Sequence, residues 1–192
     1  MTKKIVILFS GSGTNLENII KTLHKKSFDS TTIEIAGLIC NNPNAKGIEK
    51  ALKYDIKTDI INHKDFSSRH EFDTKLVNKI NEFKPDLVVL AGFMRILSPI
   101  FTDNIKAINL HPSILPLFKG DKAIIESWES DMKIAGISVH YVSGELDGGK
   151  IIDQLSFHKN ETKTYEAYED KIHSLEYELL PKVIINLLSK TL

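Results

Sequence analysis

Cysteine, net charge and long apolar runs are all scarce in this sequence. The single cysteine, Cys40, excludes an internal disulfide and a metal site built from several cysteines. The 25 basic and 25 acidic residues cancel, so no overall charge favours nucleic acid as a partner. Only five strongly apolar residues, 5–9, follow the N-terminal Met-Thr-Lys-Lys, which is too few for a signal peptide or a membrane span. We therefore expect a cytoplasmic protein with neither nucleic acid nor membrane as its partner.

The 192 residues are enough for one α/β domain with a full core. Apolar runs of strand length alternate with helical patterns in the first half, which predicts a Rossmann-like arrangement and a mostly parallel, twisted sheet. Two later runs, 134–142 and 150–157, are joined by a short segment and should be antiparallel strands near the C-terminus. The longest helical pattern covers 164–190, where Pro181 should kink the helix or end its first half. The other expected strands are 4–9, 33–40, 57–61, 87–90 and a run around Ile108, and the other expected helices are 16–23, 47–53, 69–83, 123–129 and one that begins at Ser98.

A glycine-rich turn, residues 11–15, joins the first expected strand to the first expected helix. Glycines in this position let backbone N–H groups approach a phosphate, and the helix dipole favours the anion. The dinucleotide motif is incomplete, because Leu16 replaces its third glycine and no acidic residue ends the next strand, which disfavours a nicotinamide-dependent dehydrogenase. A Walker A Lys-Ser/Thr pair is also missing. The turn predicts a mononucleotide or sugar-phosphate site, and a tight turn without a ligand stays the alternative.

Asn109 and His111 stand at the end of a short apolar run. Asn109 alternates with its two apolar neighbours, and Pro112 biases His111 toward extended geometry. Open α/β sheets bind ligands at such carboxyl ends of strands. An amide can donate to a developing oxyanion, and an imidazole transfers protons near neutral pH. Asp147, on the turn 146–149, supplies a candidate carboxylate, although a capped strand end with an ordinary turn aspartate fits the same spacing.

The segment 91–97 is unusually apolar for the exit of a strand, where a polar loop is the usual sequence. Gly92 permits a sharp turn and Met94 is adaptable, so a flat aromatic ligand could bind there. A buried connection that packs on the core explains the segment equally well. His140 lies inside an expected strand and is interpreted as structural, and the histidines at 24, 63, 70, 158 and 173 have no spacing that suggests a metal site.

Five motifs follow one another along nearly the whole chain: Gly11-Ser12-Gly13-Thr14-Asn15-Leu16, Leu90-Ala91-Gly92-Phe93-Met94-Arg95-Ile96-Leu97, Asn109-Leu110-His111-Pro112-Ser113-Ile114-Leu115-Pro116, Ser138-Val139-His140 and Glu145-Leu146-Asp147-Gly148-Gly149. In this order they resemble the phosphoribosylglycinamide formyltransferases, the folate-dependent family of purine synthesis. The resemblance implies the formyltransferase fold, with a phosphate-binding half, 1–100, and a catalytic and folate-binding half, 101–192. It implies that the co-substrate 10-formyltetrahydrofolate donates its formyl group to the amine of N1-(5-phospho-D-ribosyl)glycinamide. The products would be the N2-formyl ribonucleotide and tetrahydrofolate, in de novo purine (IMP) biosynthesis.

The resemblance also implies residue roles, without a metal. The amide of Asn109 and a protonated His111 would stabilise the oxyanion of a tetrahedral intermediate. Asp147 would keep His111 protonated and help to move the proton of the amine. The ribonucleotide would be held by Gly11, Ser12, Gly13, Thr14, Asn15 and Glu176. The folate would be held by Arg69, Leu90, Met94, Arg95, Ile96, Leu97, Val142, Ser143, Gly144, Glu145 and Leu146.

Three other functions are weighed against this one. A formyltetrahydrofolate hydrolase resembles the same fold but needs no phosphate loop and usually carries a regulatory domain. A methionyl-tRNA formyltransferase would need a further C-terminal domain and a basic face. A non-catalytic nucleotide-binding protein would keep the loop 11–15 but would gain nothing from Asn109, His111 and Asp147. We expect small-molecule substrates as partners and a possible homodimer; the run 117–122 departs from the family pattern, in which some members carry further histidines.

Overall fold

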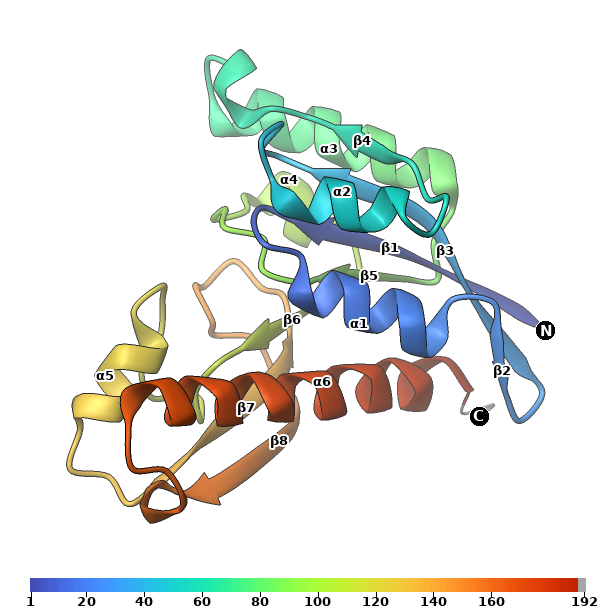
Figure 1. Ribbon diagram of the computed structural model, residues 1–192. Coiled ribbons are helices and arrows are strands. Elements are labelled where there is room, and N and C mark those ends of the chain that lie inside the picture. Colours follow the sequence, from blue (N-terminus) through green and yellow to red (C-terminus); the bar gives the residue numbers. More distant parts are fainter. Residues whose placement is uncertain (190–192) are drawn as a thin grey trace.

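The computed structural model, which describes residues 1–189, contains an eight-stranded mixed sheet (Figure 1). The parallel strands are β1 (Thr2–Phe9), β3 (Thr31–Cys40), β4 (Thr58–Ile60), β5 (Leu87–Leu90) and β6 (Ala107–His111). They run in the order β3-β1-β5-β6, and β4 pairs with β3. The antiparallel strands are β2 (Lys26–Phe28), beside β3, and then β7 (Ile134–Tyr141) and β8 (Ile151–His158), beyond β6. The predicted mostly parallel sheet with antiparallel strands near the C-terminus is confirmed.

Helices cover both faces of this sheet because the residues of β1 are apolar on both sides. Ile5, Ile7 and Phe9 belong to the core beneath α1 (Thr14–Leu23), α2 (Lys46–Leu52) and α6 (Tyr165–Ser189). Val6 and Leu8 belong to the core on the opposite face, beneath α3 (Arg69–Phe83) and α4 (Pro99–Thr102). All five side chains are fully buried, and each such burial stabilises the fold by about 1.5–3 kcal/mol. The short helix α5 (Ala123–Glu129) lies beside α6 (Figure 1).

The long helix α6 continues through Pro181, so the prediction that this proline could end the first half of the helix is wrong. Proline has no N–H to donate to the carbonyl four residues earlier, which here belongs to Tyr177. That carbonyl instead accepts a hydrogen bond from Nδ2 of Asn18 on α1, at 2.9 Å. A neighbouring helix thus satisfies the group that the proline leaves free. The end predicted for this helix, Lys190, lies outside the described residues.

The carboxyl ends of β3, β1, β5 and β6 meet at one edge of the sheet, because these strands are parallel neighbours. Residues 10–15 follow β1, Asn41 follows β3, residues 91–97 follow β5, and His111 is the last residue of β6. The predicted site residues that follow β1 and β5 or end β6 therefore leave the sheet together, and Asn41, which was not predicted, lies beside them. Within the described residues, we find no helix that is both long and apolar enough to cross a membrane.

Candidate active site

A cavity of about 700 Å³ opens where β1 and β3 end, and all five residues of the predicted phosphate loop line it together with Glu176. The helix α1 begins at Thr14, directly after Gly13, whose φ of 68° is left-handed. A Cβ on Gly13 would lie 2.5 Å from the Cα of Gly47, so no other residue type fits there. No side chain caps this end of α1, which leaves its first N–H groups for an anion in the cavity.

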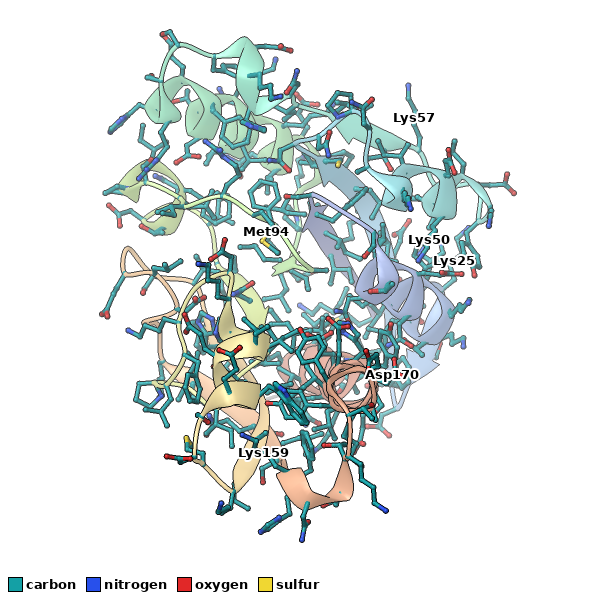
Figure 2. All side chains as sticks on the ribbon, turned by 60° about the vertical axis from the view of Figure 1, so that its left-hand side comes forward. Lys25, Lys50, Lys57, Met94, Lys159 and Asp170 are labelled. Atoms are coloured by element: carbon teal, nitrogen blue, oxygen red, sulfur yellow. The ribbon has the colours of Figure 1, made fainter. Side chains whose placement is uncertain are left out.

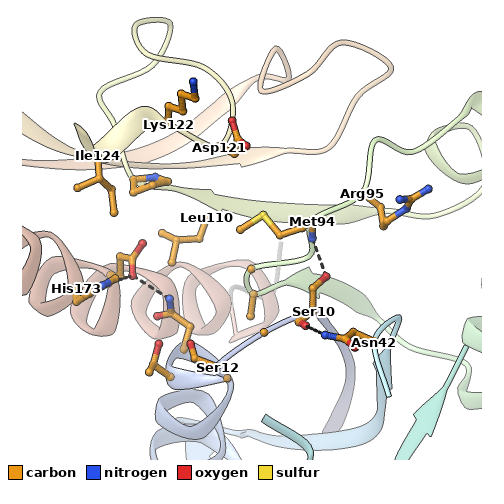
Figure 3. A pocket seen from close by; sticks show the side chains of 18 of the residues that line it. Ser10, Ser12, Asn42, Met94, Arg95, Leu110, Asp121, Lys122, Ile124 and His173 are labelled. Atoms are coloured by element: carbon orange, nitrogen blue, oxygen red, sulfur yellow. Dashed lines mark hydrogen bonds and ion pairs between the residues drawn. The ribbon is translucent and has the colours of Figure 1, made fainter. Parts of the chain in front are cut away.

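Glu176 joins α6 to the phosphate loop. Its side chain is largely buried, and its Oε2 accepts from Nδ2 of Asn15 at 3.0 Å and from Nδ1 of His173 at 2.9 Å. The hydrogen bond to Glu176 raises the pKa of His173 above its ordinary value, although burial opposes this. Figure 3 shows His173 at the wall of the cavity. Oδ1 of Asn15 is buried without a hydrogen-bond partner among residues 1–189, on a residue that lines the cavity.

Nine of the eleven predicted folate residues line a second, smaller cavity of about 80 Å³. Those that line it are Leu90, Arg95, Ile96, Leu97, Val142, Ser143, Gly144, Glu145 and Leu146. Arg95 also lines the larger cavity, and Met94, which is 68% exposed, lines only the larger one. Figure 2 shows Met94 near the middle of the molecule, between the part that contains α3 and the part that contains α5. Arg69 is exposed at the start of α3 and lines neither cavity.

Asn109, His111 and Asp147 meet beside the smaller cavity. The carboxylate of Asp147 is 8% exposed, and its Oδ2 lies 3.4 Å from Nδ1 of His111. The same oxygen accepts from the N–H of Gly120 at 2.9 Å, while Oδ1 accepts from Nδ2 of Asn109 at 3.4 Å. Two of the three predicted catalytic residues, Asn109 and Asp147, line the cavity itself.

His111 is 4% exposed and lines neither cavity. Its Nε2–H donates to the carbonyl of Phe118 at 2.7 Å, and Nδ1 faces Asp147, so both ring nitrogens have protein partners. The hydroxyl of Ser113 donates to the neighbouring carbonyl of Leu117 at 2.6 Å and lies 3.2 Å from the carbonyl of Phe118. The run 117–122, to which the sequence assigned no role, therefore closes over His111.

His140 belongs to this cluster, and sequence reasoning missed its contacts. It lies opposite Asn109 in the antiparallel pairing of β6 with β7. Its Nδ1–H donates to the carbonyl of Tyr141 at 2.9 Å, and its Nε2 lies 3.2 Å from Nδ2 of Asn109. Nε2 also lies 3.6 Å from Oδ1 of Asp147. The motif Ser138-Val139-His140 was the available signal, but its use required the register of two strands.

Electrostatics keep Asp147 ionised. Burial raises the pKa of this carboxyl, but the His140 ring, the N–H of Gly120 and His111 together outweigh burial and lower its pKa below the ordinary value. A carboxyl of low pKa is a weak base at neutral pH, so Asp147 is suited to orient and stabilise a cationic imidazole. Within residues 1–189 no group of three or more His, Cys, Asp and Glu side chains is arranged to hold a metal ion.

Comparison with known proteins adds sequence and structural relatives. The family model described as formyl transferase matches residues 3–184. Phosphoribosylglycinamide formyltransferase of Bacillus subtilis (strain 168) is 35% identical over 188 residues, which are 97% of this chain and 95% of that protein. The trifunctional purine biosynthetic protein adenosine-3 of Gallus gallus is 36% identical over 183 residues, which are 94% of this chain but 18% of that protein.

Solved structures of proteins with the same name as the Bacillus subtilis relative superpose on this chain. The crystal structure of phosphoribosylglycinamide formyltransferase from Campylobacter jejuni subsp. jejuni NCTC 11168 superposes with a TM-score of 0.95 at 58% identity, over 97% of this chain and 98% of that chain. The enzyme of that name from Bacillus halodurans superposes with a TM-score of 0.90 at 34% identity, over 98% and 96%. The chain is a member of the class of formyl transferases. The family model that matches residues 3–184 and the superposed structures define this class, and the fold with its two adjoining cavities agrees with it. Within it, the chain belongs to the phosphoribosylglycinamide formyltransferase family.

Proposed function

We propose that this protein transfers the formyl group of 10-formyltetrahydrofolate to the amine of N1-(5-phospho-D-ribosyl)glycinamide. One observation carries the proposal: a cavity built for a phosphorylated ligand adjoins a second cavity that holds Asn109 and Asp147. Arg95 lines both cavities, so the two cavities adjoin. The family to which the chain belongs supports the identity of the substrates.

The ribonucleotide would occupy the larger cavity. Its phosphate would accept hydrogen bonds from the backbone of residues 11–15 at the uncapped start of α1. The ribose hydroxyls would donate to Glu176 and to the unpartnered Oδ1 of Asn15. The protonated form of His173 would add a positive charge to the same wall.

The formyl folate would enter the smaller cavity with its pterin ring between the segments 90–97 and 142–146. Leu90 and Leu97 are almost fully buried there and offer an apolar wall to a flat ring. Arg95 stands where the two cavities adjoin. Arg69, which is exposed outside both cavities, would contact only the distal, anionic part of a bound folate.

The reaction needs donors for an oxyanion and an acceptor for a proton. The amine nitrogen attacks the formyl carbon, and the former carbonyl oxygen becomes negatively charged. His111 Nε2–H donates to a carbonyl oxygen in this structure, that of Phe118, and the formyl oxygen would replace it as the acceptor. Asn109 would donate beside it, and each such donor contributes about 10²–10³ to the rate. Collapse of the intermediate breaks the bond to the folate nitrogen, which takes the proton that the amine releases.

Asp147 stabilises the imidazolium of His111 while this charge develops, because its carboxylate faces Nδ1 at 3.4 Å. His140 holds the amide of Asn109 from the opposite side. A water molecule between the amine and Asp147 would carry the proton during the transfer. The residues themselves thus supply what the reaction requires, without a metal in the mechanism.

We further propose that the enzyme acts in the cytoplasm, in de novo purine biosynthesis, with small molecules as its only substrates. The name of the avian relative, a purine biosynthetic protein, supports the pathway. The division into a phosphate-binding half and a catalytic half, and the possible homodimer, stay predictions. Sedimentation at micromolar concentration would decide the oligomeric state.

An absorbance assay tests the proposed function. The protein is mixed with 10-formyltetrahydrofolate, and deformylation is followed with and without the ribonucleotide. Deformylation only in the presence of the ribonucleotide is the expected result. Equal rates without it would show that water is the acceptor, and the hydrolase alternative would replace the proposal. No deformylation under either condition would favour a nucleotide-binding protein without catalysis.

A further inference from the structure

We infer that Ser10 is a positioning residue, whose hydroxyl fixes the folate-side segment 91–97 against the phosphate loop 11–15. The inference rests on the proposed function and concerns how two substrates that bind to different loops are held in register. Ser10 stands between β1 and the phosphate loop and lies at the wall of the larger cavity. Its hydroxyl is occupied by Asn41 and by the N–H of Met94, so it would act on the reaction through these residues.

Two hydrogen bonds join Ser10 to the folate-side segment. The backbone N–H of Ser10 donates to the carbonyl of Gly92 at 3.0 Å. The backbone N–H of Met94 donates to Oγ of Ser10 at 2.8 Å, and Figure 3 shows this contact at the centre of the cavity wall. The bond to Gly92 uses the backbone of Ser10 and survives any substitution of its side chain. The bond from the N–H of Met94 uses the hydroxyl, so it is lost when the hydroxyl is removed.

The direction of the bonds at this hydroxyl is fixed by chemistry. A serine hydroxyl has one hydrogen, and the N–H of Met94 can only donate, so Oγ accepts from Met94. Its own hydrogen therefore goes to Oδ1 of Asn41, which lies 2.6 Å away. Asn41, which directly follows β3, is 3% exposed, and its backbone carbonyl lies 3.0 Å from Nδ1 of His63. The hydroxyl thus joins the ends of three neighbouring strands, β3, β1 and β5.

This junction lies where a small movement would affect both substrates. Met94 lines the larger cavity, and the next residue, Arg95, lines both cavities. Without the hydroxyl, the N–H of Met94 loses its partner, and only the backbone bond from Ser10 to Gly92 still joins the segment 91–97 to Ser10, so the part of the segment from Met94 onward can shift. A formyl group held by a displaced segment would no longer face the amine, and reactions between two bound groups depend steeply on such alignment.

The test compares Ser10→Ala, which removes the hydroxyl, with Ser10→Thr, which keeps it. Steady-state kinetics give kcat and the KM for 10-formyltetrahydrofolate, while calorimetry gives the Kd of tetrahydrofolate and of the ribonucleotide. In Ser10→Ala kcat should fall, because the formyl group no longer faces the amine, and the folate KM and the tetrahydrofolate Kd should rise about three- to tenfold, the usual effect of one hydrogen bond. The ribonucleotide Kd should change less than the folate values, because the loop 11–15 and Glu176 that line its cavity keep their own contacts, and Ser10→Thr should restore the folate values.

Ser174→Ala is the matched control, because it removes an exposed hydroxyl that donates only to the carbonyl of Lys171, at 2.7 Å on α6. It should change none of these constants. An unchanged folate KM in Ser10→Ala would overturn the inference. So would a parallel loss of both affinities with a lower melting temperature and no rescue by threonine, since that pattern describes general damage to the fold.

The inference and the proposed function can fail separately. If the wild type binds tetrahydrofolate but transfers no formyl group, the proposed function is wrong, and calorimetry with Ser10→Ala still tests the role of the hydroxyl. If the wild type transfers the formyl group and Ser10→Ala matches it in every constant, only the inference is wrong. A wild type that binds no tetrahydrofolate would overturn both.

Discussion

Asp147→Asn is the substitution with the clearest consequence for turnover. The carboxylate lies within 3.4 Å of Nδ1 of His111 and within 3.6 Å of Nε2 of His140, and its side chain is 8% exposed. Asparagine keeps the volume and one oxygen, which can still accept from Gly120, but it removes the negative charge. The imidazolium of His111 then loses the anion that stabilises it during the reaction.

The expected effect on kcat is a fall of about 10²–10⁴, the usual contribution of assisted proton transfer. The Kd of the ribonucleotide should not change, because Asp147 does not line the larger cavity. The stability effect has a definite sign. The pKa of Asp147 in the folded protein lies below its ordinary value of 3.8, so its stabilising contribution is present above that pH and disappears as the pH falls through the lowered pKa. The difference in melting temperature between wild type and variant should therefore shrink in acid.

The assay combines single-turnover kinetics with calorimetry of the ribonucleotide. Asp153→Asn serves as the control, since Asp153 is a partly exposed carboxylate that contacts Lys182 at 3.4 Å, and loss of its charge should leave kcat unchanged. The reasoning would be refuted if Asp147→Asn kept the kcat of the wild type. It would also be refuted if ribonucleotide binding fell as much as turnover, because the residue would then act on binding.

Three further substitutions test the ribonucleotide cavity. Glu176→Ala should weaken ribonucleotide binding at least about tenfold in calorimetry, because hydrogen bonds to a charged group are lost, and an unchanged Kd would exclude Glu176 from the site. The pKa of His173 is raised above 6.5, so its positive charge, and its contribution to stability, are present below that pH and are lost as the pH rises through the raised pKa. The affinity of the wild type for the ribonucleotide should therefore fall as the pH rises through this raised pKa, whereas the affinity of His173→Gln should change less with pH. Identical plots of Kd against pH would contradict this role of His173. Gly13→Ala should reduce the free energy of unfolding by about 1–3 kcal/mol, since the added Cβ would lie 2.5 Å from Gly47. Denaturant melts measure this loss, and Gly144→Ala, whose Cβ meets nothing within 4 Å, should show none.

The sheet could be predicted from the sequence because its central strands are apolar on both faces. Runs such as β1 and β5 have no polar alternation, and only burial between two layers of helices explains them. The strand β2 was not predicted, because three residues are too few for a pattern. The course of α6 through Pro181 was not predictable either, since it depends on a hydrogen bond from another helix, that of Asn18 to Tyr177.

The site could be predicted only in part, for a similar reason. From the residues alone Asp147 was a candidate beside Asn109 with an ordinary turn aspartate as the alternative, and only the resemblance grouped the two; in the structure Nδ2 of Asn109 donates to Oδ1 of Asp147 at 3.4 Å. His140 required the register between β6 and β7, which no local pattern contains. The closure over His111 depends on Phe118, a non-glycine residue with a φ of 53°, a conformation that its sequence does not predict. The role of Glu176 came from the family resemblance alone.

The fate of the formyl carbon tests the central claim most directly. The wild type is incubated with 10-formyltetrahydrofolate that carries ¹³C in the formyl group, together with unlabelled ribonucleotide, and the products are examined by NMR. The label should appear in an amide on the ribonucleotide, with one equivalent of tetrahydrofolate formed. Label found in formate, with the ribonucleotide unchanged, would contradict formyl transfer and would establish water as the acceptor.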